Sequence, residues 1–317
     1  MKKYLLLPTI TVITLIAFVA CNQNESEIIP HDNRKEVNFS SNIAQIDAPL
    51  TRATGTTWAE SDSIGIYMFE ESVTNVVENK RNIKYITELG GKPGLFTPND
   101  EIIFFPDNGD NVRFMSYYPY TTNVSSYVYK VDVSDQSKQS AIDLLYSFDV
   151  DTKYNKTVPG KKVPLLFDHK LTKININIKP GNGLDDDDII NTIVSFDGFN
   201  TQADFNLISG ELSNADEPET IISLNKDAAA DGYTVSYESI VIPVKNPSAA
   251  KIIFDLNNED TGNGTSSDLF LWKFPNDVEL QSGFEYIYNV TINRSGIVVE
   301  ATINEWKDGG FDDINAE

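Results

Sequence analysis

A strict alternation of apolar and polar residues that ends in a turn is a strong indication of the fold. It runs Ile174-Asn175-Ile176-Asn177-Ile178 and stops at Pro180-Gly181. A period of two places every second side chain on the same face of a strand, so the segment is predicted to be a half-buried antiparallel β-strand. Its backbone N–H and C=O groups then need partners from other strands.

Similar strand patterns recur along the whole chain. We expect strands at 37–43, 64–69, 112–120, 127–133, 192–199, 233–244, 251–256, 269–274, 286–292 and 297–306. Turn-forming Asn, Asp, Gly and Ser lie between them, and no long segment has the 3.6-residue period of a helix. The best helix candidate is 134–146, with Ser134 as a possible cap. The sequence therefore predicts an all-β protein with at most one or two short helices.

The length of 317 residues favours two domains, each with its own hydrophobic core. We place an export signal at 1–20, a leader at 21–52, a first β-sandwich domain at 53–165 and a second at 166–317. The single cysteine excludes an intramolecular disulfide, so stability must come from packing. With 47 acidic and 25 basic residues the net charge is -22, which argues against a nucleic acid or an anionic membrane surface as a partner.

The first residues carry the marks of an export signal. Two lysines follow Met1, and residues 4–20 are almost wholly apolar. A short transmembrane span is one interpretation. A secretory signal is favoured, because the segment is N-terminal, follows lysines and ends in small residues. Phe18-Val19-Ala20-Cys21 resembles a bacterial lipobox, which implies that Cys21 carries a lipid anchor. Residues 22–27, which are polar and include Glu25 and Glu27, resemble a short acidic signal for transport to the cell surface.

Arg52 lies in a link between two predicted strands, at 37–43 and 64–69. The link reads Leu50-Thr51-Arg52-Ala53-Thr54-Gly55, and its Thr and Gly residues are typical of an exposed, extended connection. A trypsin-like protease can bind the arginine side chain there and cut before Ala53. Such a cut would separate the first strand from the rest of the chain.

Several motifs in this order together resemble the fimbrillin family, which comprises pilus subunits and related surface lipoproteins of gut and oral anaerobes. They are the lipobox ending in Cys21; Thr51-Arg52-Ala53-Thr54 followed by Trp58 and by residues 62–67; Tyr117-Tyr118-Pro119-Tyr120; residues 165–174; and residues 283–290 with 301–306. They span nearly the whole chain.

The resemblance implies two β-sandwich domains of transthyretin-like topology and export as a lipoprotein to the outer membrane and cell surface. It also implies that an arginine-specific protease cuts between Arg52 and Ala53, and that the first strand leaves a groove, which a strand of another pilus subunit fills. Val37, Phe39 and Ile43 would be the inward side chains of the leaving strand.

The C-terminus departs from that pattern. After Trp306 only eleven residues remain, with Gly309-Gly310 and three aspartates among them, which suits a donor strand poorly. Either the strand at 297–306 swings out to donate, or the subunit accepts a strand without giving one. The second case fits a tip or accessory subunit.

Several residues could in principle take part in catalysis or ligand binding, but a structural role is the stronger expectation for each of them. His169 follows Asp168, but no serine or cysteine nucleophile accompanies the pair. The acidic runs at 185–188 and 255–262 could bind a cation, yet neither fits an EF-hand loop. Trp58, Trp272 and Trp306 could stack on sugars, although packing in a core is the stronger expectation. No catalytic residue, metal or cofactor is expected.

Two hypotheses follow. The first is a non-enzymatic subunit of a cell-surface fimbria that contributes to adhesion. The alternative is a lipid-anchored surface protein that binds a glycan or a host protein and does not polymerise.

Overall fold

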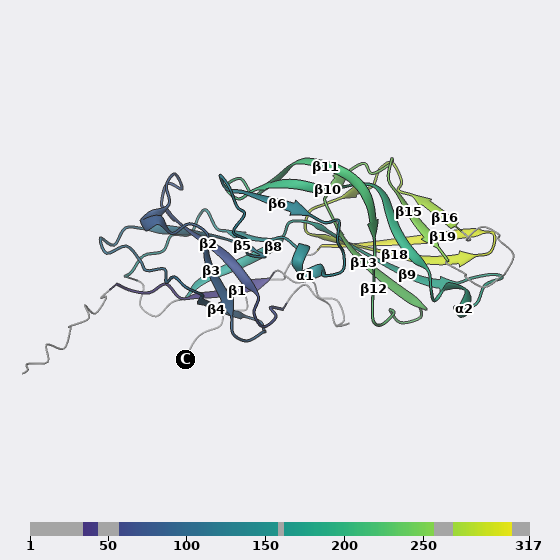
Figure 1. The fold of residues 1–317 in the computed structure, drawn as a ribbon, viewed down its shortest axis with the longest axis horizontal. Helices are drawn as coiled ribbons and strands as arrows, with labels where there is room; N and C mark the ends of the chain where they lie inside the picture. The colour runs from purple at the N-terminus through teal and green to yellow at the C-terminus, as the bar shows by residue number, and fades with distance from the viewer. Residues whose placement is uncertain (1–33, 44–56, 158–161, 257–268, 306–317) are drawn as a thin grey trace, which may run out of the picture. The chain divides into compact units, whose positions relative to one another are not determined.

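The computed structural model describes residues 34–43, 57–157, 162–256 and 269–305 (Figure 1). They belong to one compact unit that begins at Arg34. Strands dominate the described residues, and helix is limited there to single turns at Val77–Asn79 (η1), Gln139–Ile142 (α1) and Asp186–Ile189 (α2). The all-β prediction is confirmed.

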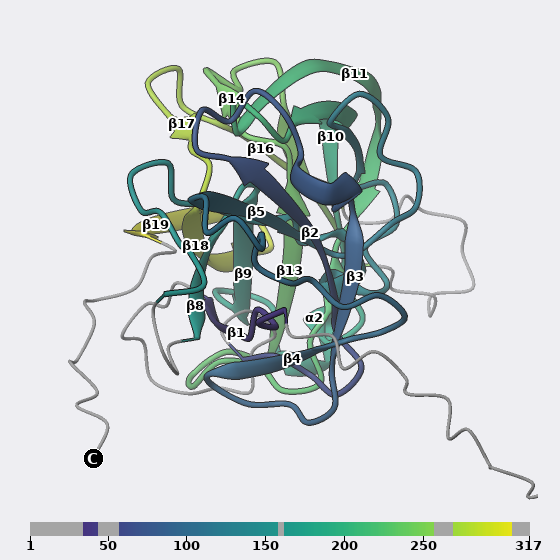
Figure 2. The same cartoon turned by 90° about the vertical axis from the view of Figure 1, so that its left-hand side faces the viewer.

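Seven strands close into a barrel in the order β1-β4-β3-β2-β5-β7-β8, and β8 pairs with β1 again. The strands are β1 (Phe39–Ile43), β2 (Ser63–Glu70), β3 (Ile83–Thr87), β4 (Gly94–Pro98), β5 (Val112–Tyr118), β7 (Leu145–Phe148) and β8 (Val163–His169). The closure depends on β1, whose parallel pairing with β8 joins the two ends of the sheet (Figure 2).

Two further sheets share a second hydrophobic core. One has the order β11-β10-β15-β16, with β6 also paired to β10, and the other has the order β12-β13-β9-β18-β19. The first consists of β6 (Val128–Asp132), β10 (Ile193–Asn206), β11 (Glu211–Ile222), β15 (Lys251–Asp255) and β16 (Leu269–Lys273). The second consists of β9 (Thr172–Pro180), β12 (Leu224–Asn225), β13 (Val235–Val241), β18 (Phe284–Asn293) and β19 (Gly296–Glu305). A small pair, β14 (Val244–Lys245) and β17 (Glu279–Leu280), completes the fold.

Strand β2 serves both cores, which explains its nearly continuous apolar sequence. Ile64, Ile66 and Met68 lie in the barrel core. Tyr67 and Phe69, which point the other way, lie in the second core. A strand that is covered on both faces has no solvent side and therefore loses the alternation of a surface strand.

The alternating strand at 174–178 forms as predicted within β9, but its polar face is also buried. The Asn177 side chain accepts a hydrogen bond from Ser236 Oγ (2.7 Å) and donates one to Asn289 Oδ1 (2.9 Å). β9 pairs antiparallel with β13 and parallel with β18. Asn177 thus acts as a partner for polar groups of the neighbouring strands rather than for water.

The helix expected at 134–146 is reduced to one turn, α1. Its N-cap is Lys138, without a side-chain capping bond, while Ser134 Oγ donates to Asp132 Oδ1 instead (2.6 Å). Leu145 and Tyr146 belong to β7, where they pair with strands on both sides. These two residues of the range expected to be helical are therefore strand positions, because tertiary pairing outweighs the local pattern.

The division of the chain at 165/166 remains a prediction. β8 runs across that point, and the chain enters the second pair of sheets with β9, after His169. β6 also comes from the predicted first domain but pairs with β10 along five residues.

Gly65 in β2 is a position where a side chain would be costly. A Cβ added there would lie 2.3 Å from the ring of Tyr117 and 2.5 Å from Asn82 Oδ1. We expect Gly65→Ala to lower the free energy of unfolding by about 1–3 kcal/mol, because the well-packed ring has to shift. Denaturant titration measures this, and an unchanged midpoint would contradict the packing described.

Candidate strand-exchange site

Strand β1 fills the gap between β4 and β8. It runs antiparallel to β4, where Phe39 lies opposite Phe96 and Ser41 opposite Gly94. It runs parallel to β8, with matched residues from Phe39 and Val163 onward. Within the described residues, β1 is therefore the strand that pairs with both of these edges.

The inward side chains of β1 are enclosed by the barrel. Val37 and Ile43 are buried, Phe39 is only 2% exposed and Ser41 only 1%. The Phe39 ring makes edge-to-face contacts with Tyr85 and Phe114, with centroid distances of 5.2 and 5.1 Å. Aromatic pairs of this kind add to the stabilisation that burial gives.

The residues before β1 hold the same segment in place. Val37 N donates to Ile103 O (2.9 Å), and Val163 N donates to Asn38 O (2.8 Å). The Arg34 guanidinium lies 4.5 Å from the centre of the Phe104 ring. Backbone pairing thus extends on both sides of the segment beyond the assigned strand.

Trp58 is part of the same hydrophobic core of the barrel as Phe39 and Ile43 of β1. Its indole packs edge-on against Phe96, Tyr118 and Phe167, with centroid distances of 4.9, 5.4 and 5.2 Å. Its backbone exchanges two hydrogen bonds with Gly91. Trp58 is a core residue, as expected from its surroundings in the sequence, and is not available for sugar binding.

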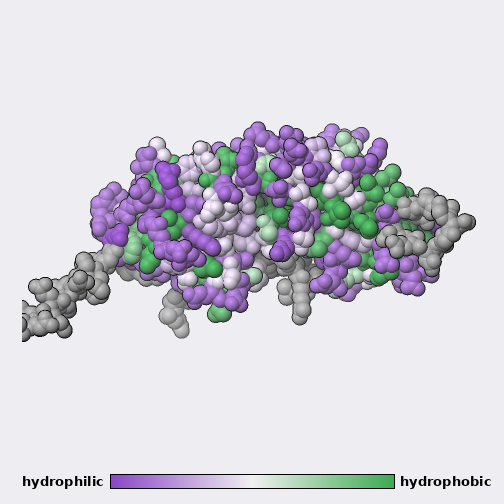
Figure 3. All heavy atoms as spheres, in the orientation of Figure 1, coloured by the Kyte–Doolittle hydropathy of each residue, from purple (hydrophilic) through white to green (hydrophobic). Residues whose placement is uncertain are grey.

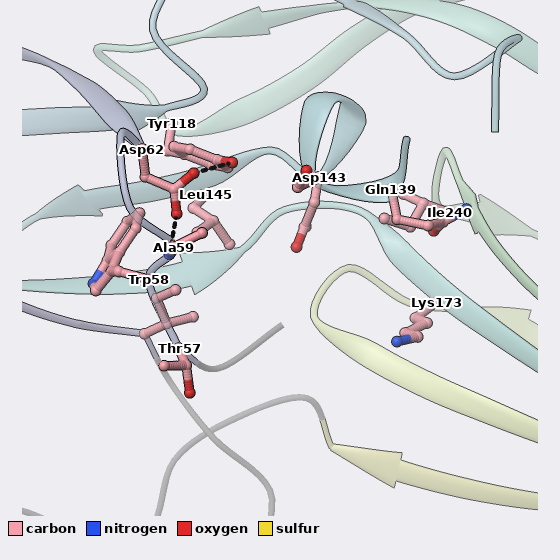
Figure 4. Close-up of a pocket in the computed structure, with 12 residues that line it drawn as sticks. Thr57, Trp58, Ala59, Asp62, Tyr118, Gln139, Asp143, Leu145, Lys173 and Ile240 are labelled. Atoms are coloured by element: carbon pink, nitrogen blue, oxygen red, sulfur yellow. Dashed lines mark hydrogen bonds between the residues drawn. The ribbon is translucent and has the colours of Figure 1, made fainter. Parts of the chain in front are cut away.

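A small cavity of about 140 Å³ opens at the end of β1 (Figure 4). Ile43 and Thr57, the described residues on either side of residues 44–56, both line it. In its wall Asp62 accepts hydrogen bonds from Ala59 N (2.7 Å) and Tyr118 Oη (3.0 Å). Burial raises the pKa of the Asp62 carboxyl, and the two hydrogen bonds oppose that shift.

Several predicted positions lie outside the described residues. These are Cys21, Arg52, Ala53 and Trp306. Among the described residues, no helix is long and apolar enough to span a membrane. The burial of Val37, Phe39 and Ile43 is seen directly, whereas their role as side chains of a leaving strand stays a prediction.

The residues considered for chemistry have structural partners. His169 Nδ1 lies 2.9 Å from Asp143 Oδ1 in a buried pair, so its partner comes from the segment after α1. Asp185 caps α2: it accepts a hydrogen bond from Asp188 N, and its own N–H donates to the Asp188 side chain. Trp272 packs against Phe274 and Tyr288.

Comparison with known protein families shows which family the chain belongs to. A family model described as fimbrillin-like matches residues 51–306. The chain belongs to the fimbrillin-like family. A proposed fimbrium subunit of Bacteroides uniformis, Fim1C, is 31% identical to this fimbrillin-like chain over the full length of both proteins.

Solved structures share the fold of this fimbrillin-like chain. A proposed cell adhesion protein of Bacteroides uniformis is 29% identical, with a TM-score of 0.69 over 88% of this chain and 100% of the other. A similar protein of Bacteroides ovatus, 22% identical, has a TM-score of 0.64 over 87% and 99% of the two chains. The second likeness concerns the fold alone.

Sequence reasoning missed Ser41, and it did not place Trp58 in the site. Ser41 continues the period of two between Phe39 and Ile43, so the pattern could have placed it inside despite its polarity. Trp58 had no local signal for its place under β1, because its contacts come from β4, β5 and β8.

Proposed function

We propose that this chain is a structural subunit of a cell-surface fimbria, which contributes to adhesion and assembles by strand exchange. In this proposal it is exported as a lipoprotein with its anchor on Cys21, reaches the outer membrane and is cut between Arg52 and Ala53 by an arginine-specific protease. The family and the fimbrium and adhesion names of its relatives support a fimbrial role. The observation that carries the exchange step is the place of β1 between β4 and β8, N-terminal to Arg52.

Loss of β1 would create an acceptor groove. The facing N–H and C=O groups of β4 and β8 would lose their partners, and the space occupied by Val37, Phe39, Ser41 and Ile43 would open. Both consequences are unfavourable in water until another strand enters. Addition of a strand restores the backbone hydrogen bonds and refills the apolar slot.

Strand β19 is the part of the described chain that best fits a donor. It lies at the edge of its sheet, and among the described strands it pairs with β18 alone. Ile303 is 57% exposed although it lies opposite the buried Tyr286. Release of β19 would make this chain a repeating subunit. If β19 stays in place, the chain accepts a strand without giving one, as a tip or accessory subunit does.

A strand-capture experiment tests this proposal. The full chain is cut with an arginine-specific protease, the leader is released in mild denaturant, and a labelled peptide of residues 34–45 is offered during refolding. We expect stable capture of the peptide and none of a control peptide with the same residues in scrambled order. Equal capture of the two peptides, or no capture, would contradict a groove shaped by β1.

One observation favours the alternative, a lipid-anchored protein that binds a partner without polymerising. Apolar side chains gather on the surface around β15 and β16 (Figure 3). Leu271 of β16 is 59% exposed, and Leu269 and Ile193 are also exposed. For this alternative, protein recovered from cells would be monomeric and would retain its lipid.

A further inference from the structure

We propose that Trp58 limits the size of one side chain of the strand that replaces β1: the side chain that enters at the Ser41 position must be small. This inference rests on the proposed strand exchange and specifies which strands the groove accepts. It concerns a strand of a neighbouring subunit, for which β1 serves as the template.

Three strands meet at the Ser41 position. Ser41 lies opposite Gly94 on β4 and opposite Leu165 on β8. Gly94 has no side chain, and the Trp58 indole occupies the space beside it: a Cβ built on Gly94 would lie 2.3 Å from Trp58 Cδ1. The indole therefore occupies the volume that the missing side chain of Gly94 leaves inside the barrel, and Ser41 lies directly opposite that glycine.

The indole has little freedom to move away. Three aromatic rings surround it, and its backbone is fixed to Gly91 by hydrogen bonds of 2.9 and 3.2 Å. Protein cores are packed to about the density of organic crystals, so an extra branched side chain at this position forces rings off their preferred positions.

The size limit at the Ser41 position does not depend on the leader being present. Trp58, Gly94 and Leu165 all follow Arg52 in the sequence and stay with the body after the cut. The neighbouring position differs, because the space around Phe39 is bounded by the rings of Tyr85 and Phe114 and takes a large side chain. The groove thus selects a strand with a large apolar residue, then a small residue, then a branched apolar residue, each two positions apart.

Strand β19 of a second copy meets the size limit at the Ser41 position, although Val299, which would lie at the Phe39 position, is smaller than phenylalanine. On one of its faces Val299, Ala301 and Ile303 lie opposite Val290, Tyr288 and Tyr286 of β18. Ala301 is the small residue of that series and would occupy the Ser41 position. On the opposite face, the residues are Val298, Glu300 and Thr302. The middle one, Glu300, would lie at the Ser41 position and is not small.

The test is the strand-capture assay with single changes in the peptide of residues 34–45. Ser41→Ala is expected to bind within about threefold of the unchanged peptide, and Ser41→Leu about ten to a hundred times more weakly. Ser40→Leu is the matched control, because Ser40 lies on the outer face between Leu95 and Pro164 and should tolerate the larger residue.

A body with Trp58→Leu should recover most of the binding of the Ser41→Leu peptide. A second measurement does not depend on the folding of the Trp58→Leu body. In the uncut chain, the Ser41→Leu variant should have a thermal midpoint well below that of the Ser40→Leu variant. Equal binding of the Ser41→Leu and Ser40→Leu peptides would overturn the size limit and leave strand exchange intact. Failure of the unchanged peptide to bind would overturn strand exchange and the size limit with it.

Discussion

Replacing Phe39 by alanine in the uncut chain is expected to lower the free energy of unfolding by about 3–5 kcal/mol. The ring is 2% exposed and contacts two other rings, so its removal loses both transfer free energy and edge-to-face contacts and leaves a cavity. Chemical denaturation followed by circular dichroism measures the change. Few single substitutions in the leader should have a comparable effect, since its other inward side chains are smaller.

Ser40→Ala is the matched control for that experiment. Ser40 lies one position along the same strand but on the outer face, so its loss should change stability by no more than about 0.5 kcal/mol. Similar values for Phe39→Ala and Ser40→Ala would mean that β1 is not an integral strand of the barrel in solution.

The Arg52→Ala substitution is expected to abolish fibre assembly while leaving the protein folded. Without the cut, β1 stays covalently attached to the barrel that it closes. An attached strand competes at an effective concentration in the millimolar range or above, which a free subunit cannot match. Electron microscopy of fibres and the mass of the recovered chain measure assembly and processing together.

Arg34→Ala serves as the control for Arg52→Ala. Arg34 is the other arginine of the leader, and it lies beside Phe104 and Glu78. Its loss should permit both the cut and assembly. Normal fibres formed by the Arg52→Ala chain would refute maturation at this link.

The sequence was sufficient for much of the fold and for part of the site. Alternation revealed β9 and the strand that contains Phe39, because a one-sided environment leaves a period of two in the sequence. The same rule failed for β11 (Glu211–Ile222), a strand of mostly exposed polar residues whose evidence is its backbone pairing with β10. Leu145, which lies in the range expected to be helical, is a strand residue for the converse reason: its environment is set by distant strands.

The long-range features of the site could not be read from local patterns. The parallel pairing of β1 with β8 joins residues more than a hundred positions apart, and no residue type marks such a partner. The contact between Trp58 and Gly94 likewise depends on where β4 lies in the barrel. These features decide the shape of the groove, and they follow from the closure of the sheet.

The N-terminal residue of this chain in purified fibres is the decisive measurement for strand exchange after the cut at Arg52. Mass spectrometry of fibres detached from the cell surface would identify it without any substitution. We expect a chain that begins at Ala53, with its leader strand replaced by a strand from another subunit. A chain in the fibre that still begins at a lipid-modified Cys21 would show that assembly proceeds with β1 in place, contrary to the strand exchange proposed.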